Sequence, residues 1–65
     1  MNADVVRVAY RPAEVGEALG VSRSKAYELI ASGAIRSILV GNSRRVPAEC
    51  LRQFVEQQLE ASAAK

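Results

Sequence analysis

The stretch from Gly20 to Val46 constrains the fold of this 65-residue chain more than any other. Its first half predicts a short helix from Ser22 to about Ser32. Ser22 can cap that helix, because a serine hydroxyl accepts a hydrogen bond from a free backbone N–H of the first turn. Gly33 can end the helix, because glycine readily adopts the left-handed conformation that follows a last turn. The predicted inward face consists of Ala26, Leu29 and Ile30.

The second half of this stretch predicts a two-stranded hairpin. The run from Ile35 to Val40 is apolar and rich in β-branched residues, and residues 41–43 (Gly-Asn-Ser) are a turn signal. A second strand follows at residues 44–46, and Pro47 stops it. Because an isolated hairpin is only marginally stable in water, we expect this one to lie against the helices. The residues expected to make that contact are Ile35, Ile38, Val40 and Val46.

The start of the predicted helix carries cations at its unfavourable end. Arg23 and Lys25 lie in the first turn, where the helix already carries about half a positive charge. Each cation costs about 0.3–1 kcal/mol there, whereas a bound phosphate would reverse the sign of the interaction. The alternative is two surface cations that tolerate a small penalty. Tyr27 leaves two interpretations open: a half-buried ring with its hydroxyl in water, or a hydroxyl that binds a phosphate.

Positive charge is concentrated in this stretch. The whole chain has a formal net charge of +2, but residues 22–46 hold five basic residues and one acidic residue, whereas the remainder carries −2. A basic centre between acidic flanks is typical of nucleic-acid binding; the alternative is chance clustering on a solvated face. At the hairpin tip, Arg44 and Arg45 follow Asn42 and Ser43. These arginines either contact DNA or protect a strand edge from aggregation.

Size and composition argue against several classes of function. A domain of this length buries only about 60% of its unfolded surface, which leaves no room for a deep active site. The sequence has no histidine and one cysteine, Cys50, so no internal disulfide, Cys/His metal site or histidine-activated nucleophile can be built. We therefore expect no enzyme activity, no metal and no cofactor. Without a long apolar run or a signal-peptide pattern, we expect a cytoplasmic protein that does not bind membranes.

Two further helices are expected on either side of this stretch. The first begins near Pro12, carries Val15, Ala18 and Leu19 at helical spacing, and ends at Gly20. Only a few residues separate it from the next helix, so the pair forms a helix-turn-helix. Residues 1–9, rich in valine, favour extended structure and a short strand paired with the hairpin.

The last helix begins near Pro47 or Ala48 and is expected mainly to cover the core, with Leu51, Phe54, Val55 and Leu59 on one face. Residues 61–65 either fray or extend to a neighbour. The predicted fold class is α+β: a small winged helix-turn-helix with a two-stranded wing hairpin and a C-terminal helix. We expect one domain over residues 1–65, with its core at about residues 10–59 and flexible ends.

Two segments carry a resemblance to a known family: RPAEVGEALGVSRSKAYELIASGAI and, after it, VGNSRRVPAECLRQFV. Together they resemble the excisionase-type, MerR-like winged-helix family. In that family the first helix ends in LGVS, and a basic wing closes on an arginine followed by Val/Ile-Pro. The match covers roughly Tyr10 to Val55, and it is specific as a set although each piece alone is weak.

The resemblance implies a protein similar to phage excisionases, including those of mycobacteriophages, which act as recombination directionality factors. Such a protein would bind repeated sites on double-stranded DNA cooperatively at an attachment site and bend the DNA. It would assist a tyrosine integrase in excision and hinder integration. We expect a monomer in solution that assembles on DNA beside neighbouring copies of itself.

The resemblance also supports a set of DNA-binding residues. The helix at residues 22–32 would enter the major groove, and the wing at residues 41–45 would lie along the minor groove or the backbone. The predicted contacts are Ser22, Arg23, Ser24, Lys25, Tyr27, Asn42, Ser43, Arg44 and Arg45. The chain departs from the family where Asn42 and Ser43 replace residues that are often basic, and where Leu39 replaces a polar or basic residue. These departures indicate weaker binding by the wing, or a protein contact at Leu39.

Two alternatives from the sequence remain open. A small phage or bacterial transcriptional regulator would need the same helix and wing. A protein-interaction module would instead use the exposed hairpin edge or the last helix, and its binding would be insensitive to salt.

Overall fold

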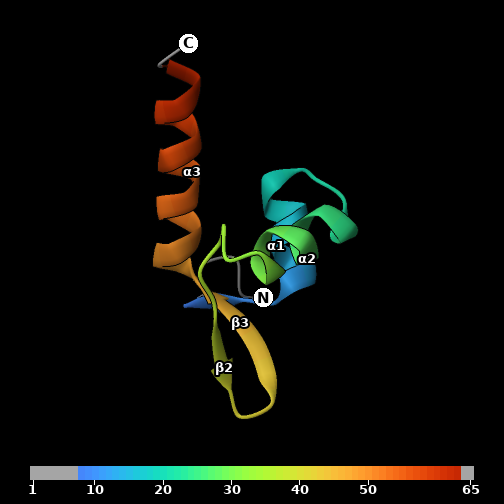
Figure 1. The fold of residues 1–65 in the computed structure, drawn as a ribbon. Coiled ribbons are helices and arrows are strands. Elements are labelled where there is room, and N and C mark those ends of the chain that lie inside the picture. The colour runs from blue at the N-terminus through green and yellow to red at the C-terminus, as the bar shows by residue number, and fades with distance from the viewer. Residues whose placement is uncertain (1–7, 64–65) are drawn as a thin grey trace, which may run out of the picture.

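The computed structural model describes residues 8–63, which form three helices and a small antiparallel sheet (Figure 1). The elements follow in the order β1 (Ala9–Tyr10), α1 (Pro12–Leu19), α2 (Arg23–Ala31), β2 (Ile38–Val40), β3 (Ser43–Pro47) and α3 (Ala48–Ala63). This is the predicted α+β fold, a helix-turn-helix followed by a wing and a C-terminal helix. The expectations of extended structure at Val5 and Val6 and of flexible ends at residues 1–7 and 64–65 lie outside the described range, whereas α3 continues as a helix through Ala63.

Two glycines shape the helix-turn-helix, one at the end of α1 and one where α1 approaches α2. Gly20 ends α1 in the left-handed conformation, with a φ of 74°. Gly16 lies inside α1 against the start of α2, where an added Cβ would lie 3.2 Å from the carbonyl oxygen of Val21 and 3.5 Å from the Cβ of Ala26. The absence of a side chain at Gly16 therefore lets the two helices approach closely.

The sheet has the strand order β1-β3-β2, so the N-terminal strand β1 pairs with β3 on the side opposite to β2. Ala9 pairs with Pro47 and Tyr10 pairs with Val46. The hairpin pairs Leu39 with Arg44, and its turn passes through Gly41 at a φ of 64°. A strand is thus present before the first helix, but it lies at Ala9–Tyr10 and overlaps the expected range, residues 1–9, only at Ala9.

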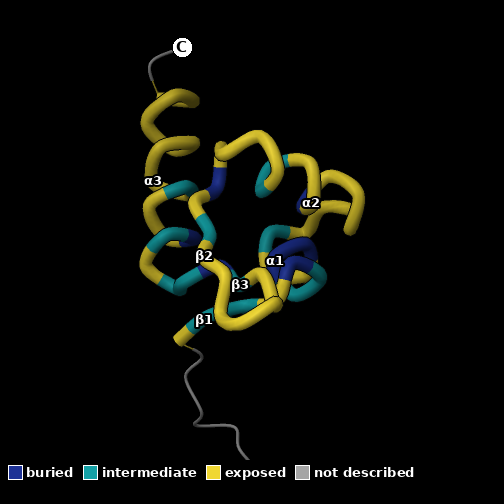
Figure 2. The backbone as a smooth tube through the Cα atoms, turned by 60° about the horizontal axis from the view of Figure 1, so that its bottom comes forward, coloured by how far each residue is buried: buried dark blue, intermediate teal, exposed yellow. Residues whose placement is uncertain are grey.

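The core is small and gathers where α1, α2, β3 and the start of α3 converge (Figure 2). Val15, Ala26, Ile35 and Val46 are fully buried, and Leu51 is nearly so. Two expected contacts of the hairpin are wrong, because Ile38 and Val40 are 48% and 58% exposed. The other two expected contacts are confirmed, because Val46 on β3 and Ile35 in the loop before β2 are both buried in the core.

The strand expected from Ile35 begins three residues later, at Ile38. The physical reason is the end of α2: Gly33 turns the chain at a φ of 85°, and the Ile35 N–H then donates to the Leu29 carbonyl at 3.1 Å. That bond holds Ile35 against the last turn of α2, so it cannot join the sheet. The wing therefore extends away from the core, on the opposite side from the C-terminal end of α3 (Figure 1).

The expected role of α3 as core cover holds only for its first half. Leu51 is buried and Phe54 packs against the core, but Val55 and Leu59 are 45% and 68% exposed. Ala18 of α1, expected in an apolar stripe, is exposed as well. The helix runs past the other described elements (Figure 1), so the side chains of its later turns are exposed. No helix within residues 8–63 is both long and apolar enough to cross a membrane.

Candidate nucleic-acid interface

The first turn of α2 presents an uncompensated positive end. The Ser22 hydroxyl accepts a hydrogen bond from the Lys25 N–H at 3.1 Å, which confirms the predicted cap. Arg23, Ser24 and Lys25 are all exposed, and the turn contains no acidic residue. Its sole ion pair within the described chain joins Lys25 to Glu28 at 4.0 Å. Such an exposed pair contributes about 0–1 kcal/mol, so the helix end still favours an anion.

The wing carries its two arginines in different settings. Arg44 is exposed, and its Nη1 donates to the hydroxyl of Ser37 at 3.3 Å. Arg45 is half-buried, and its Nη1 donates to the Arg44 carbonyl at 2.8 Å. Within residues 8–63 neither guanidinium forms an ion pair with a carboxylate. Asn42 and Ser43 are exposed at the hairpin turn. Both arginines can therefore take an anion without losing an acidic partner.

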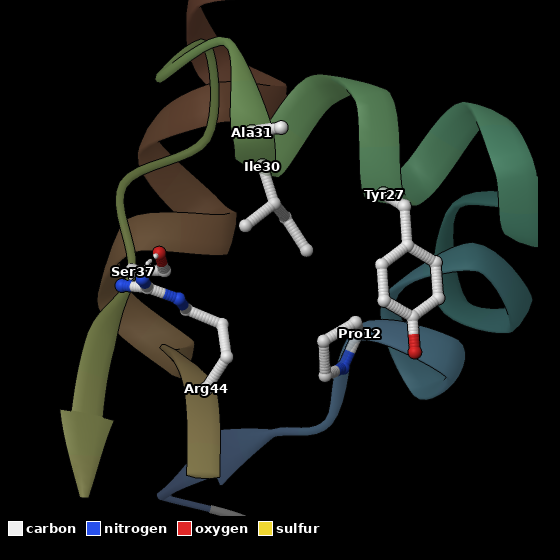
Figure 3. Close-up of a pocket in the computed structure, with 6 residues that line it drawn as sticks. All are labelled: Pro12, Tyr27, Ile30, Ala31, Ser37 and Arg44. Atoms are coloured by element: carbon white, nitrogen blue, oxygen red, sulfur yellow. Dashed lines mark hydrogen bonds between the residues drawn. The ribbon is translucent and has the colours of Figure 1, made fainter. Parts of the chain in front are cut away.

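Tyr27 of α2 faces the wing across a cavity (Figure 3). Tyr27 is 50% exposed, which is compatible with both interpretations of the sequence. It lines one side of a cavity of about 490 Å³ whose other side is formed by Ser37 and Arg44 of the hairpin segment (Figure 3). The fold thus brings Tyr27 and Arg44, which are distant in sequence, to a single opening. Their binding to DNA stays a prediction, as it does for the rest of the predicted set.

Ser37 is the residue of this region that sequence reasoning missed. The alternation of side chains along a strand could have predicted that Ser37 lies near Arg44. Leu39 pairs with Arg44, and residues two apart on a strand lie on the same face of the sheet, so Ser37 is a diagonal neighbour of Arg44. This prediction also requires the pairing register of β2 and β3, which the sequence alone does not give.

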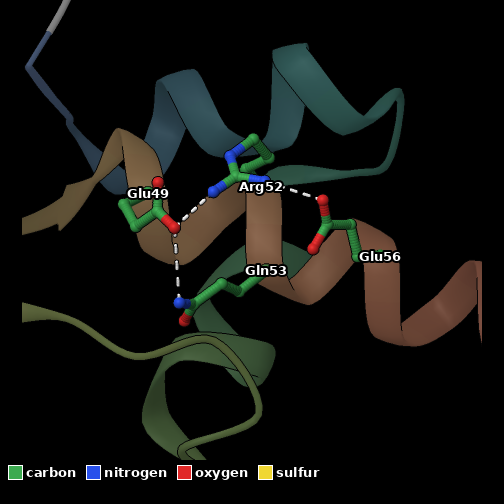
Figure 4. Close-up of polar contacts among 4 residues, drawn as sticks. All are labelled: Glu49, Arg52, Gln53 and Glu56. Carbon is green, nitrogen blue, oxygen red and sulfur yellow. Dashed lines mark hydrogen bonds and ion pairs between the residues drawn. The ribbon is translucent and has the colours of Figure 1, made fainter.

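One basic residue is neutralised outside this region. Arg52 of α3 donates to Glu49 and, at 2.7 Å, to Glu56, and Gln53 donates to Glu49 at 3.4 Å (Figure 4). Hydrogen bonding and the charge of Arg52 lower the pKa of Glu49, and the same contact raises the pKa of Arg52. Among residues 8–63, the cations of α2 and the wing have no comparable network of carboxylates. Residues 8–63 contain no group of three or more metal-binding side chains.

Comparison with known proteins places this geometry in a family. The model of a helix-turn-helix domain matches residues 9–59. An excisionase of Streptomyces ambofaciens is 44% identical over 46 residues, which cover 71% of this chain and 74% of that protein. A probable excisionase of Saccharopolyspora erythraea is 33% identical over 58 residues, 89% of this chain but only 59% of that longer protein. No solved structure matches. The chain belongs to the excisionase-type helix-turn-helix family.

Proposed function

We propose that this chain is a DNA-binding excisionase that acts without chemistry of its own. The observation that carries the proposal is the pair of cationic elements, the first turn of α2 and the wing, whose only ion pair within residues 8–63 is the weak, exposed one between Lys25 and Glu28. A helix of this kind places the exposed residues of its first turns against base edges in the major groove. The wing arginines would then lie against the backbone or in the minor groove, where negative potential favours arginine.

One copy would bind weakly. Five cations from Arg23 to Arg45 would neutralise about four phosphates, which is few for a specific site. Neighbouring copies on repeated sites would raise occupancy, because each contact between them adds to the binding of the next copy. A row of such copies can also supply the contacts that offset the energy of bending DNA. We therefore infer cooperative binding at repeated sites of a phage attachment region, with bending that assists a tyrosine integrase in excision and hinders integration.

The experiment that tests the proposal begins with a selection from random-sequence DNA, which supplies the binding motif. Probes carrying tandem copies of that motif, placed at different distances from the probe ends, are then titrated in gel shifts. A cooperative ladder whose mobility depends on motif position supports the architectural role. The same probes with Arg23→Ala/Lys25→Ala should shift weakly, whereas Gln57→Ala, on an exposed position of α3, should behave as the wild type.

Other outcomes separate the alternatives. A single shift without bending would contradict the architectural role and favour a transcriptional regulator, which needs the same helix and wing. An absence of any shift at low salt would contradict DNA binding itself and favour a protein-interaction module. If bending is found, adding the purified protein to an integrase reaction should promote excision and suppress integration.

A further inference from the structure

The cavity between α2 and the wing has a composition that suits one kind of ligand. It is open to solvent, has a volume of about 490 Å³ and draws on three parts of the chain (Figure 3). Its lining residues are Pro12, Tyr27, Ile30, Ala31, Ser37 and Arg44. Pro12, Ile30 and Ala31 contribute apolar surface, whereas the Tyr27 hydroxyl and the Arg44 guanidinium are donors on opposite sides.

A sugar–phosphate backbone has the matching chemistry. Its deoxyribose rings present carbon atoms that can pack on an apolar floor, and its phosphates accept hydrogen bonds from tyrosine hydroxyls and guanidinium groups. No acidic side chain of the described residues lines this cavity, whereas a shallower depression on α1 is lined by Glu14 and Glu17. An anionic strand is therefore favoured in the first hollow and repelled by the second.

Ser37 holds the guanidinium of Arg44, the charged group of this cavity, by a hydrogen bond. An exposed arginine on a hairpin samples many rotamers, and binding a phosphate must restrict them. The bond from Arg44 Nη1 to the Ser37 hydroxyl, at 3.3 Å, uses one of the five guanidinium donors and leaves the others available. Ser37 therefore orders Arg44 before any ligand arrives, although it need not touch the ligand.

We propose that this cavity, the backbone cleft, binds one sugar–phosphate unit of the DNA strand that runs between α2 and the wing. The Tyr27 hydroxyl and the Arg44 guanidinium bind oxygens of the two phosphates that flank the deoxyribose of that unit. Ser37 is a positioning residue for Arg44. The inference rests on the proposed function, since it deepens the DNA-binding site. It assigns the cleft to the backbone and not to a base edge.

The test replaces single phosphates of the selected DNA site by uncharged methylphosphonates and measures affinity by fluorescence anisotropy. With the wild type, substitution at one or two adjacent positions should weaken binding about tenfold, as expected for hydrogen bonds to a charged group. Tyr27→Phe and Arg44→Ala should each weaken binding to normal DNA by about fivefold to tenfold, and should be insensitive to methylphosphonate at the position that each residue contacts. Tyr27→Phe keeps the ring, so the packing of α2 is unchanged.

Two controls distinguish the cleft from general charge. Arg36→Ala removes the same charge from an exposed residue that does not line the cleft, so it should leave the positions of the sensitive phosphates unchanged. Ser37→Ala should weaken binding about twofold to fourfold, and adding it to Arg44→Ala should cause no further loss. Circular dichroism establishes that each variant is folded.

The outcomes separate this inference from the proposed function. If Tyr27→Phe and Arg44→Ala bind DNA with the wild-type pattern of sensitive phosphates, the cleft assignment is wrong while DNA binding stands. If Tyr27→Phe changes the preferred base sequence instead, the tyrosine contacts a base and the assignment is again wrong. If the wild type binds no DNA, the proposed function fails and the inference fails with it.

Discussion

Lys25 is the residue whose charge conflicts most directly with its place in the fold. It lies in the first turn of α2, and its N–H donates to the capping hydroxyl of Ser22. Lys25→Glu would improve the interaction with the helix dipole by about 0.3–1 kcal/mol, partly offset by losing the exposed pair with Glu28. The same change removes the attraction to phosphate, so stability should hold or rise while DNA affinity falls. Thermal unfolding and gel shifts measure the two effects.

The matched control for this change is Lys65→Glu, which reverses the same charge at the end of the sequence. It should weaken DNA binding far less than Lys25→Glu. If Lys25→Glu binds DNA as well as the control does while remaining folded, the assignment of α2 as the recognition helix is wrong.

Ser22 and its neighbour Ser24 separate stability from binding. Ser22 caps α2 through its hydroxyl, so Ser22→Ala should cost about 1 kcal/mol, or about 4–8 °C in Tm for a domain of this size. Ser24 is exposed in the same turn, and Ser24→Ala should leave Tm nearly unchanged. Calorimetry checks both. Equal losses of Tm would contradict the assignment of Ser22 as the cap.

At the scale of elements, the loop between α2 and the wing contributes to the core where the wing strand does not. Ile35 is fully buried and Ile38 is 48% exposed. Ile35→Val should cost about 0.5–1.5 kcal/mol, because it removes a buried methylene, whereas Ile38→Val should cost much less. Urea denaturation of the two variants measures the difference. A larger loss for Ile38→Val would show that the wing packs against the core after all.

The contrast between Ile35 and Ile38 also shows which features a sequence can predict. Helix ends followed from local chemistry: Ser22 caps a helix, and Gly20 and Gly33 take positive φ values. The strand start was misplaced because the bond from Ile35 to Leu29 depends on how α2 ends in three dimensions. Local propensity favoured a strand there, and tertiary contact overrode it.

Side-chain partners beyond neighbouring turns were harder to predict. The apolar spacing of α3 correctly indicated an amphipathic helix, but spacing says nothing about how far the packed partner extends, so Leu59 was wrongly expected in the core. Residue type and position along the chain predict the binding residues, and the structure brings two of them, Tyr27 and Arg44, to one cavity. The bond between Ser37 and Arg44 could not be inferred without the strand register.

The network on α3 gives a pH-dependent prediction for that element. Bonding to Arg52 lowers the folded-state pKa of Glu49 below its ordinary value. The ionised Glu49 carboxylate therefore contributes to stability at pH values above its ordinary pKa. This contribution is lost as the pH falls through the lowered pKa of the folded state. The difference in Tm between wild type and Glu49→Gln should shrink to zero across that acidic window. Glu60→Gln, outside the network, should show less of this dependence, and identical pH profiles would contradict the role of Glu49.

At the scale of the whole molecule, the arrangement of charge explains how so small a chain could hold DNA at two places. In the part of the chain that the structure describes, the cations of α2 and the wing belong to no network of carboxylates, whereas Arg52 is paired with Glu49 and Glu56 on α3. The wing extends away from the core, and the backbone cleft lies between it and α2 (Figures 1 and 3). Contacts at both elements would fix the orientation of the protein on the duplex, which binding through a single element would not.

This distribution predicts the salt dependence of binding. Neutralising about four phosphates gives a slope of log K against log salt concentration of about −3 to −4 for each bound copy. Arg44→Ala should reduce the steepness by about one unit, because it removes one phosphate contact. Arg52→Gln should leave the slope unchanged, because Arg52 is already paired within α3. Anisotropy titrations on a single-site probe between about 50 and 200 mM salt measure these slopes. A slope near zero for the wild type would mean that phosphates contribute little to binding, and the charge of α2 and the wing would then need another explanation.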